Sequence, residues 1–158
     1  MSALKPGAQR VADAAAAAGL EITIKMHAQS TRTAEDAAAA CGCDVAQIVK
    51  SLVFQGKTSG APILLLVSGA NRVNEKAVAA IIGEALKRPD AVYVRDITGY
   101  AIGGIPPLGH ASRLKTFIDK DLLQHPMVWA AAGTPESVFA VDPKRLAAAT
   151  GAITLSVK

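Results

Sequence analysis

Aromatic residues, cysteines and long hydrophobic runs are all scarce in this sequence of 158 residues. Only 4% of the residues are aromatic, too few for a surface that stacks several unpaired bases in succession. The longest apolar run, residues 61–67, is far shorter than a membrane span, so we expect no segment to cross a bilayer. Lys5, Arg10 and Asp13 interrupt the region where a secretory signal would need an apolar core. We therefore expect a cytoplasmic protein.

Motifs that announce a metal or a cofactor are also missing. Cys41 and Cys43 are separated by one glycine, which is neither a Cys-x-x-Cys redox centre nor half of a zinc site, and we expect reduced thiols. His27, His110 and His125 are scattered, and no His-x-Glu segment with a later Pro-Cys-x-x-Cys is present, which argues against a zinc nucleobase deaminase. The Walker phosphate loop and the dinucleotide fingerprint are absent as well. We predict no metal and no cofactor.

Length and composition indicate one globular domain over residues 1–158. The sequence is 51% hydrophobic and 19% charged, which is enough for a sizeable core but too short for two ordinary domains. The net charge of +4 suits an anionic partner, but the basic residues are dispersed rather than gathered in one arm. Charge alone therefore does not identify a nucleic-acid-binding protein.

Hydrophobic periodicity and capping residues predict alternating helices and strands. Helices are predicted at 5–18, between a capping Thr33 and a terminating Gly42, at 74–82 and at 143–150, with one further turn at 96–99. Strands are predicted at 21–26, 48–55, 62–68, 91–95, 114–118, 127–132, 137–141 and 153–157, and the strand at 62–68 is expected to be buried on both faces. Several strands follow one another without a helix between them. The fold class is therefore α/β with a mixed, largely antiparallel sheet and flanking helices.

Residues 103–110, Gly-Gly-Ile-Pro-Pro-Leu-Gly-His, are the segment best suited to chemistry. Pro106 and Pro107 fix the backbone and favour an extended Ile105. The three glycines of the segment can adopt backbone angles forbidden to other residues, which lets N–H groups turn toward a ligand. A tight connection with no ligand gives the same pattern, so this segment needs a second observation to decide its role.

Lys50 is that second observation, because it interrupts the apolar run from Ile48 to Phe54. A lysine that points inward loses hydration and is a candidate for binding or catalysis. Strand alternation offers the other interpretation, in which Lys50 lies on the wet face of a half-buried strand.

Three segments together resemble the YbaK and prolyl-tRNA-synthetase insertion-domain family. They are the stretch from Thr33 through Lys50-Ser-Leu-Val-Phe, the stretch from Thr98 to His110, and Ala132-Gly-Thr-Pro. The resemblance covers nearly the whole chain. It implies a compact α/β domain whose mixed sheet curls toward a barrel, and the hydrolysis of amino acids wrongly attached to tRNA, often tRNA(Pro). The implied partners are the acceptor end of aminoacyl-tRNA and prolyl-tRNA synthetase.

The resemblance also implies the site. The family's lysine corresponds to Lys50, and its Gly-x-x-x-Pro loop corresponds to Gly103–Pro107. We expect the backbone N–H groups of Gly103, Gly104 and Ile105 to stabilise an oxyanion, while Lys50 positions the substrate rather than acting as a base. The expected substrate-binding residues are Pro106, Pro107, Gly109, His110, Gly133 and Thr134, with His110 equally compatible with a surface position.

Two details bear on the substrate and on rival functions. Pro106 stands where the cysteinyl-specific members tend to carry serine, which favours branches that remove alanine or another small amino acid. The alternative function is a non-catalytic module of the same fold that binds aminoacyl-tRNA or a synthetase. A basic nucleic-acid-binding protein with an unrelated role is more remote, and a serine hydrolase lacks its Gly-x-Ser-x-Gly elbow.

Overall fold

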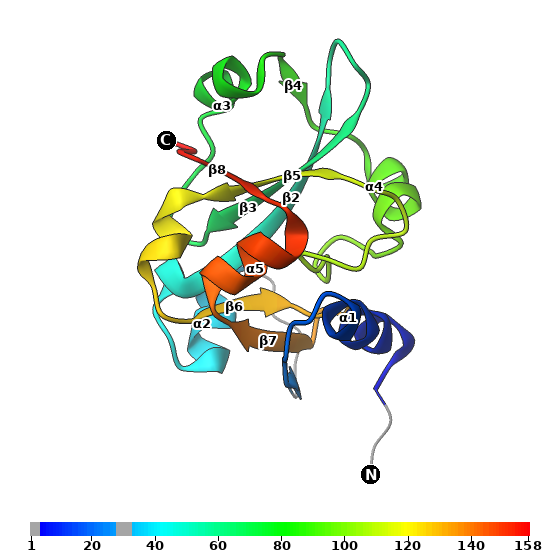
Figure 1. Ribbon diagram of the computed structural model, residues 1–158, viewed down its shortest axis with the longest axis vertical. Helices are drawn as coiled ribbons and strands as arrows, with labels where there is room; N and C mark the ends of the chain where they lie inside the picture. Colours follow the sequence, from blue (N-terminus) through cyan, green and yellow to red (C-terminus); the bar gives the residue numbers. More distant parts are fainter. Residues whose placement is uncertain (1–3, 28–32) are drawn as a thin grey trace.

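The computed structural model describes residues 4–27 and 33–158 of the chain. An eight-stranded sheet runs through the described part, with helices on both of its faces (Figure 1). Its strands are β1 (Ile24–Met26), β2 (Ile48–Gly56), β3 (Pro62–Ser68), β4 (Leu86–Lys87), β5 (Lys115–Asp119), β6 (Val128–Ala131), β7 (Ser137–Val141) and β8 (Ile153–Leu155). The spatial order is β1-β7-β6-β2-β3-β5-β8, and β4 pairs with the C-terminal end of β2.

The sheet is mixed, as the sequence predicted. The pairs β1–β7, β6–β7, β2–β3 and β2–β4 are antiparallel, whereas β2–β6, β3–β5 and β5–β8 are parallel. The strands predicted at 48–55 and 62–68 form an antiparallel hairpin at the centre of the sheet, with Lys50 of β2 opposite Val67 of β3. The fold class inferred from the sequence is confirmed.

Five α-helices and two short 3₁₀ turns occur among the described residues. The helices are α1 (Pro6–Ala17), α2 (Ala34–Cys41), α3 (Glu75–Ile82), α4 (Ala91–Thr98) and α5 (Pro143–Thr150), and the 3₁₀ turns span Val45–Gln47 and Lys120–Gln124. The predicted cap of α2 is present, because Thr33 Oγ1 accepts a hydrogen bond from Asp36 N at 3.0 Å. Gly42 ends the same helix in the left-handed region, at a φ of 69°.

The predicted strand at 91–95 is wrong, because these residues form α4. Its β-branched and aromatic residues favour a strand, but the ends of the segment favour a helix. The Asp90 side chain accepts a hydrogen bond from Tyr93 N at 2.8 Å, and Gly99 ends the helix at a φ of 83°. Val94 is 4% exposed and Val92 68% exposed, so the segment buries one helical face. The turn predicted at 96–99 is the end of this helix.

Two hydrophobic cores lie on opposite faces of the sheet. Leu64 and Leu66 of β3 enter the first core, together with apolar residues of α1, α4 and α5. Leu65 and Val67 enter the second core, where Val78 of α3 packs on them. Because successive side chains of a strand point to opposite faces, β3 is buried on both sides, as predicted. Lys50 therefore lies on a strand, β2, whose hairpin partner is packed on both faces.

Helix α1 fastens the long segment between α4 and β5, which contains the glycine-proline loop. Arg10 Nη2 donates a hydrogen bond to Gly99 O at 2.8 Å, and its guanidinium lies 4.5 Å from the centre of the Tyr100 ring. The Tyr100 hydroxyl in turn donates to Gly109 O at 2.8 Å. These contacts hold both ends of the loop against the body of the protein.

Candidate functional site

A pocket of about 270 Å³ opens between the sheet, α2 and the glycine-proline loop. Strands β2, β6 and β7 supply its floor, α2 supplies one wall, and Ile102, Gly103 and Ile105 supply another. The pocket thus joins Lys50 to the loop, the two features that the sequence singled out. Trp129 and Pro135 also line it, and sequence reasoning did not identify them.

The floor of the pocket beside Lys50 is small and apolar. Val138 of β7 and Ala131 of β6 are cross-strand partners. Ala131 follows the Val49–Ala130 pair and is therefore level with Lys50 on the same face of the sheet. Because Val49 enters the first core on the opposite face, alternation brings Lys50 to the pocket side.

Lys50 is half-buried, and its ammonium group has a fixed partner. Its Nζ donates a hydrogen bond to the backbone oxygen of Asn71 at 2.5 Å. Burial lowers the pKa of Lys50 below its ordinary value, and the nearby cation Arg72 acts in the same direction, while the carboxylates of Glu35 and Asp119 oppose the shift. One ammonium hydrogen is held by the protein. Among the described residues no acceptor binds the other two, which leaves them for a ligand.

The glycines of the loop have two different reasons to be glycine. Gly103 has a φ of 102°, a conformation that side chains disfavour. Gly104 has no such angle, but a Cβ atom there would lie 2.8 Å from the backbone carbon of Thr134. The prediction from sequence treated both as conformational glycines, whereas Gly104 is required by the close approach of two loops.

The N–H groups of the loop are not equally free. Gly104 N donates to Ala101 O at 3.2 Å, so this group closes a turn and is not the free donor that the sequence suggested. The N–H groups of Gly103 and Ile105 have no hydrogen-bond partner among the described residues, and both residues line the pocket. Two of the three predicted donors are therefore available.

Four of the residues predicted to bind substrate lie outside the pocket lining. Pro106 and Pro107 are buried and do not line the pocket. His110 Nε2 lies 2.7 Å from Pro106 O, and because a carbonyl oxygen only accepts, Nε2 carries the hydrogen. Burial lowers the pKa of His110, and the bond to Pro106 partly opposes this. His110, like Gly109 and the two prolines, thus lies outside the pocket lining.

Gly133 and Thr134 are also beside the pocket rather than in it. A Cβ atom on Gly133 would lie 2.4 Å from Gly7 O of α1, which explains the glycine. Thr134 Oγ1 lies 2.5 Å from Ser137 Oγ, and Ser137 lines the pocket. Gly133 thus packs against α1, while Thr134 packs against Gly104 of the loop and contacts Ser137 of β7.

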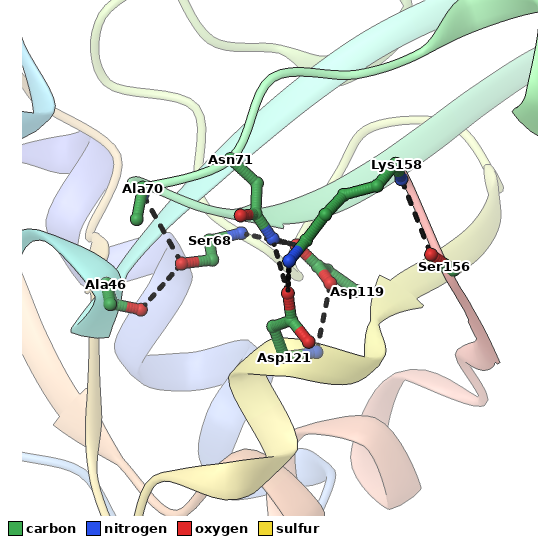
Figure 2. A network of polar contacts seen from close by, with 8 residues as sticks. All are labelled: Ala46, Ser68, Ala70, Asn71, Asp119, Asp121, Ser156 and Lys158. Atoms are coloured by element: carbon green, nitrogen blue, oxygen red, sulfur yellow. Dashed lines mark hydrogen bonds and ion pairs between the residues drawn. The ribbon is translucent and has the colours of Figure 1, made fainter.

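A polar network next to Lys50 escaped the sequence analysis (Figure 2). The side-chain amide of Asn71 donates to Asp119 Oδ2 and to Asp121 Oδ2, each at 2.8 Å. Asp119 also accepts from Ser68 N at 3.1 Å and is 1% exposed. The only signal in the sequence was an acidic residue at the end of a predicted strand, and its partner is 48 positions away.

The described residues contain no group of three or more histidines, cysteines or acids that could hold a metal ion. Cys41 and Cys43 are free thiols. Burial, followed by the nearby Cys43, raises the pKa of Cys41 to about 11, so its thiol stays protonated at neutral pH. In the part of the chain that is described, no helix is long and apolar enough to span a membrane.

Comparison with known proteins gives the family. The model of the aminoacyl-tRNA editing domain matches residues 28–149. The chain belongs to this family. A crystal structure described as "a putative trans-editing enzyme for prolyl tRNA synthetase" is similar to this chain with a TM-score of 0.93 and 44% identity, over 99% of both chains.

Two relatives indicate the range of the family. The Enterococcus faecalis protein named "Putative Cys-tRNA(Pro)/Cys-tRNA(Cys) deacylase EbsC" is 25% identical over 121 residues, which are 75% of this chain and 72% of EbsC. The proline–tRNA ligase of Bacillus licheniformis is 30% identical over 128 residues, which are 80% of this chain and 22% of the ligase. The editing domain thus occurs both as a small protein and as a part of a much larger one.

Proposed function

We propose that this protein hydrolyses the ester bond of mischarged aminoacyl-tRNA, with tRNA(Pro) carrying a small non-cognate amino acid as the substrate. The observation that carries the proposal is the meeting of Lys50 with the unbonded N–H groups of Gly103 and Ile105 in one pocket. Membership of the editing-domain family supports the reaction class. The names of the similar proteins support tRNA(Pro).

The loop supplies the stabilisation that ester hydrolysis needs. Attack of water on the ester carbonyl carbon creates a tetrahedral intermediate with a negative oxygen, and collapse of this intermediate breaks the bond to the ribose oxygen. The N–H groups of Gly103 and Ile105 are donors for the negative oxygen. Each such donor typically contributes ~3 to 4 kcal/mol to transition-state stabilisation.

Lys50 positions the substrate through the hydrogens of its ammonium group that the protein does not use. Its charge suits the ester carbonyl, a ribose hydroxyl or the terminal phosphate of the RNA. The described lining residues otherwise offer hydroxyl groups, the indole N–H of Trp129 and apolar side chains, with neither a carboxylate nor an imidazole. Water or a hydroxyl of the substrate itself therefore takes the proton from the attacking water and returns one to the ribose oxygen.

The apolar lining of the pocket favours an uncharged amino acid. Ala131 and Val138 form the floor beside Lys50, and Leu52 and Trp129 add apolar surface. A cationic amino-acid side chain placed here would lose its hydration without gaining a carboxylate partner, and an anionic one would find only Lys50, which the ester or the RNA already engages. Alanine fits this lining well, and threonine and cysteine are competitors of similar size.

The test is a panel of tRNA(Pro) molecules charged with alanine, serine, threonine, cysteine or proline, in which release of the labelled amino acid is measured. The native protein is expected to release a small non-cognate amino acid and to spare proline. Lys50→Ala should slow release by about 100-fold because the ester is no longer held in place. Lys57→Ala, an exposed lysine at the turn after β2, is the matched control and should behave as the native protein.

A protein that retains the charged tRNA without releasing any amino acid would instead be a binding module. The salt dependence of binding adds a check on which part of the RNA is held. If only the acceptor end contacts the protein, log affinity should fall against log salt with a slope of about two to four. A prolyl-tRNA synthetase partner is part of the proposal, and it predicts co-purification of the two proteins with tRNA(Pro) present.

A further inference from the structure

Asn71 connects the buried Asp119 with the ammonium group of Lys50. Its backbone oxygen accepts from Lys50 Nζ. Its side-chain amide donates to Asp119 and Asp121 (Figure 2). Its own N–H donates to Ser68 O at 2.9 Å. The backbone N–H, the backbone oxygen and the side-chain NH₂ group of Asn71 are thus engaged on different partners, which fixes the direction in which its backbone oxygen points.

The register of the sheet explains why such a connection is needed. Lys50 is opposite Val67 of β3, and Asp119 follows the Leu66–Ile118 pair of β3 and β5, which brings Asp119 level with Val67. The backbones at Lys50 and Asp119 are therefore two strand spacings apart, roughly 10 Å. A direct ion pair is not formed between them, and Asn71 bridges the gap.

Asparagine is well suited to this position. Its NH₂ group offers two hydrogens, one for each carboxylate, and so lets Asp119 and Asp121 lie close together. The bond from Asn71 is the largest influence that lowers the pKa of Asp121, ahead of Lys158, whose Nζ lies 3.0 Å from Asp121 Oδ2. An aspartate at position 71 would add a third negative charge beside Asp119 and Asp121. An alanine would remove both side-chain hydrogen bonds, so that only backbone contacts would position the backbone oxygen.

We propose that Asn71 is a positioning residue that aims the ammonium group of Lys50 into the pocket by presenting a fixed backbone oxygen to it. Asn71 touches no substrate in this account. It acts through Lys50, and the carboxylates behind it hold it in place. The charged groups that influence Lys50 are Glu35 of α2, Arg72 of the loop after β3, and Asp119 of β5. This inference adds a positioning residue to the proposed function, and its kinetic test rests on that function because it measures deacylation.

The experiment compares Asn71→Ala with Asn74→Ala. Asn74 is the same residue type three positions later, and its side chain caps α3 by accepting from Ala77 N at 3.1 Å without contacting Lys50. Asn71→Ala loses two side-chain hydrogen bonds and Asn74→Ala loses one. We expect Asn71→Ala to lower kcat for deacylation by roughly 10- to 100-fold, as misplacement of a catalytic group does, while Asn74→Ala keeps the native kcat.

A pH measurement separates positioning from a loss of stability. The bond to Asn71 O favours the charged form of Lys50. Loss of the side-chain bonds that hold Asn71 should weaken this bond, lower the pKa of Lys50 and move the alkaline decline of kcat to lower pH. A variant that is merely less stable keeps the native pH profile. The pKa of Lys50 is also measured in the free protein by NMR of its labelled side chain, with Lys50→Arg to assign the signal.

The outcomes separate this inference from the proposed function. If the native protein releases no amino acid, the proposed function fails, and the NMR comparison alone decides the role of Asn71. A native kcat together with a native Lys50 pKa in Asn71→Ala overturns the inference. Should Asn71→Ala fail to fold, Asp121→Ala removes one of the two acceptors from a more exposed position, and it should show smaller changes in the same directions. No change in that variant also overturns the inference.

Discussion

Replacing Gly104 by alanine tests whether the contact between two loops sets the geometry of the site. The added Cβ atom would lie 2.8 Å from the backbone carbon of Thr134, 2.9 Å from its Cα and 3.0 Å from its nitrogen. Contacts between carbon atoms are comfortable at about 3.5 to 4.0 Å, so the loops must separate by roughly 0.7 Å or more. All three atoms belong to the backbone, which cannot move aside as a flexible side chain can.

The expected result has a stability part and a kinetic part. Overpacking of this kind typically lowers the free energy of unfolding by about 1 to 3 kcal/mol. The separation also moves the N–H groups of Gly103 and Ile105, which flank the substitution, by a large fraction of an ångström. A displacement of about 1 Å in a reacting geometry can slow a reaction 100-fold, so we expect kcat/KM for deacylation to fall by roughly 10- to 100-fold.

Urea unfolding and deacylation kinetics measure the two parts separately. Gly83→Ala is the control, because Gly83 ends α3 at a φ of 101° with no atom near its Cβ position. It should lose about 1 to 2 kcal/mol of stability through backbone strain and keep its activity per folded molecule. If Gly104→Ala retains the native kcat/KM, or loses no more of its kcat/KM than Gly83→Ala does, the contact between the loops does not determine the geometry of the site, and the reasoning is refuted.

Two further predictions concern His110 and the cysteines. Because burial holds the pKa of His110 in the folded protein below its ordinary value of 6.5, its neutral form stabilises the fold above pH 6.5, and this contribution is lost as pH falls through the lowered pKa. His110→Gln keeps a donor for Pro106 O without titrating, so its urea midpoint should depend less on pH between about 7 and 5, and an unchanged pH dependence would contradict the assignment. The double variant Cys41→Ser, Cys43→Ser should deacylate at the native rate, because burial raises the pKa of both thiols, that of Cys41 to about 11, and a protonated thiol is a poor nucleophile. Loss of release in that variant, with an intact fold by circular dichroism, would show that a cysteine takes part.

Local signals in the sequence predicted most of the fold. Among the helices that begin at a capping side chain and end at a glycine, α2, α3 and α5 were found, for example α2 between Thr33 and Gly42. The continuous apolar run of β3 correctly predicted a strand buried on both faces. The failure at α4 came from Val92 and Tyr93, whose preference for strands was overridden by the cap at Asp90 and the burial of Val94.

The site was harder to predict than the fold, because it depends on contacts between distant segments. Lys50 was found because it interrupts an apolar strand, and the loop was found because glycine and proline gather there. The contact of Gly104 with Thr134 joins segments 30 positions apart, and no local pattern reports it. The same holds for Asn71, whose partners are 48 and 50 positions away. His110 has a local partner in Pro106 and an edge-to-face contact with Tyr100, but no local pattern reports that it lies outside the pocket lining.

Single-turnover hydrolysis of alanyl-tRNA(Pro), with the protein in excess over the RNA, tests the central claim most directly. Saturating protein removes differences in binding, so the observed rate reports the chemical step alone. The account predicts rapid release of alanine by the native protein, and release by Lys50→Ala that is about 100-fold slower although the RNA is bound. Bound alanyl-tRNA(Pro) that decays at the same rate with the native protein, with Lys50→Ala and with no protein would contradict it.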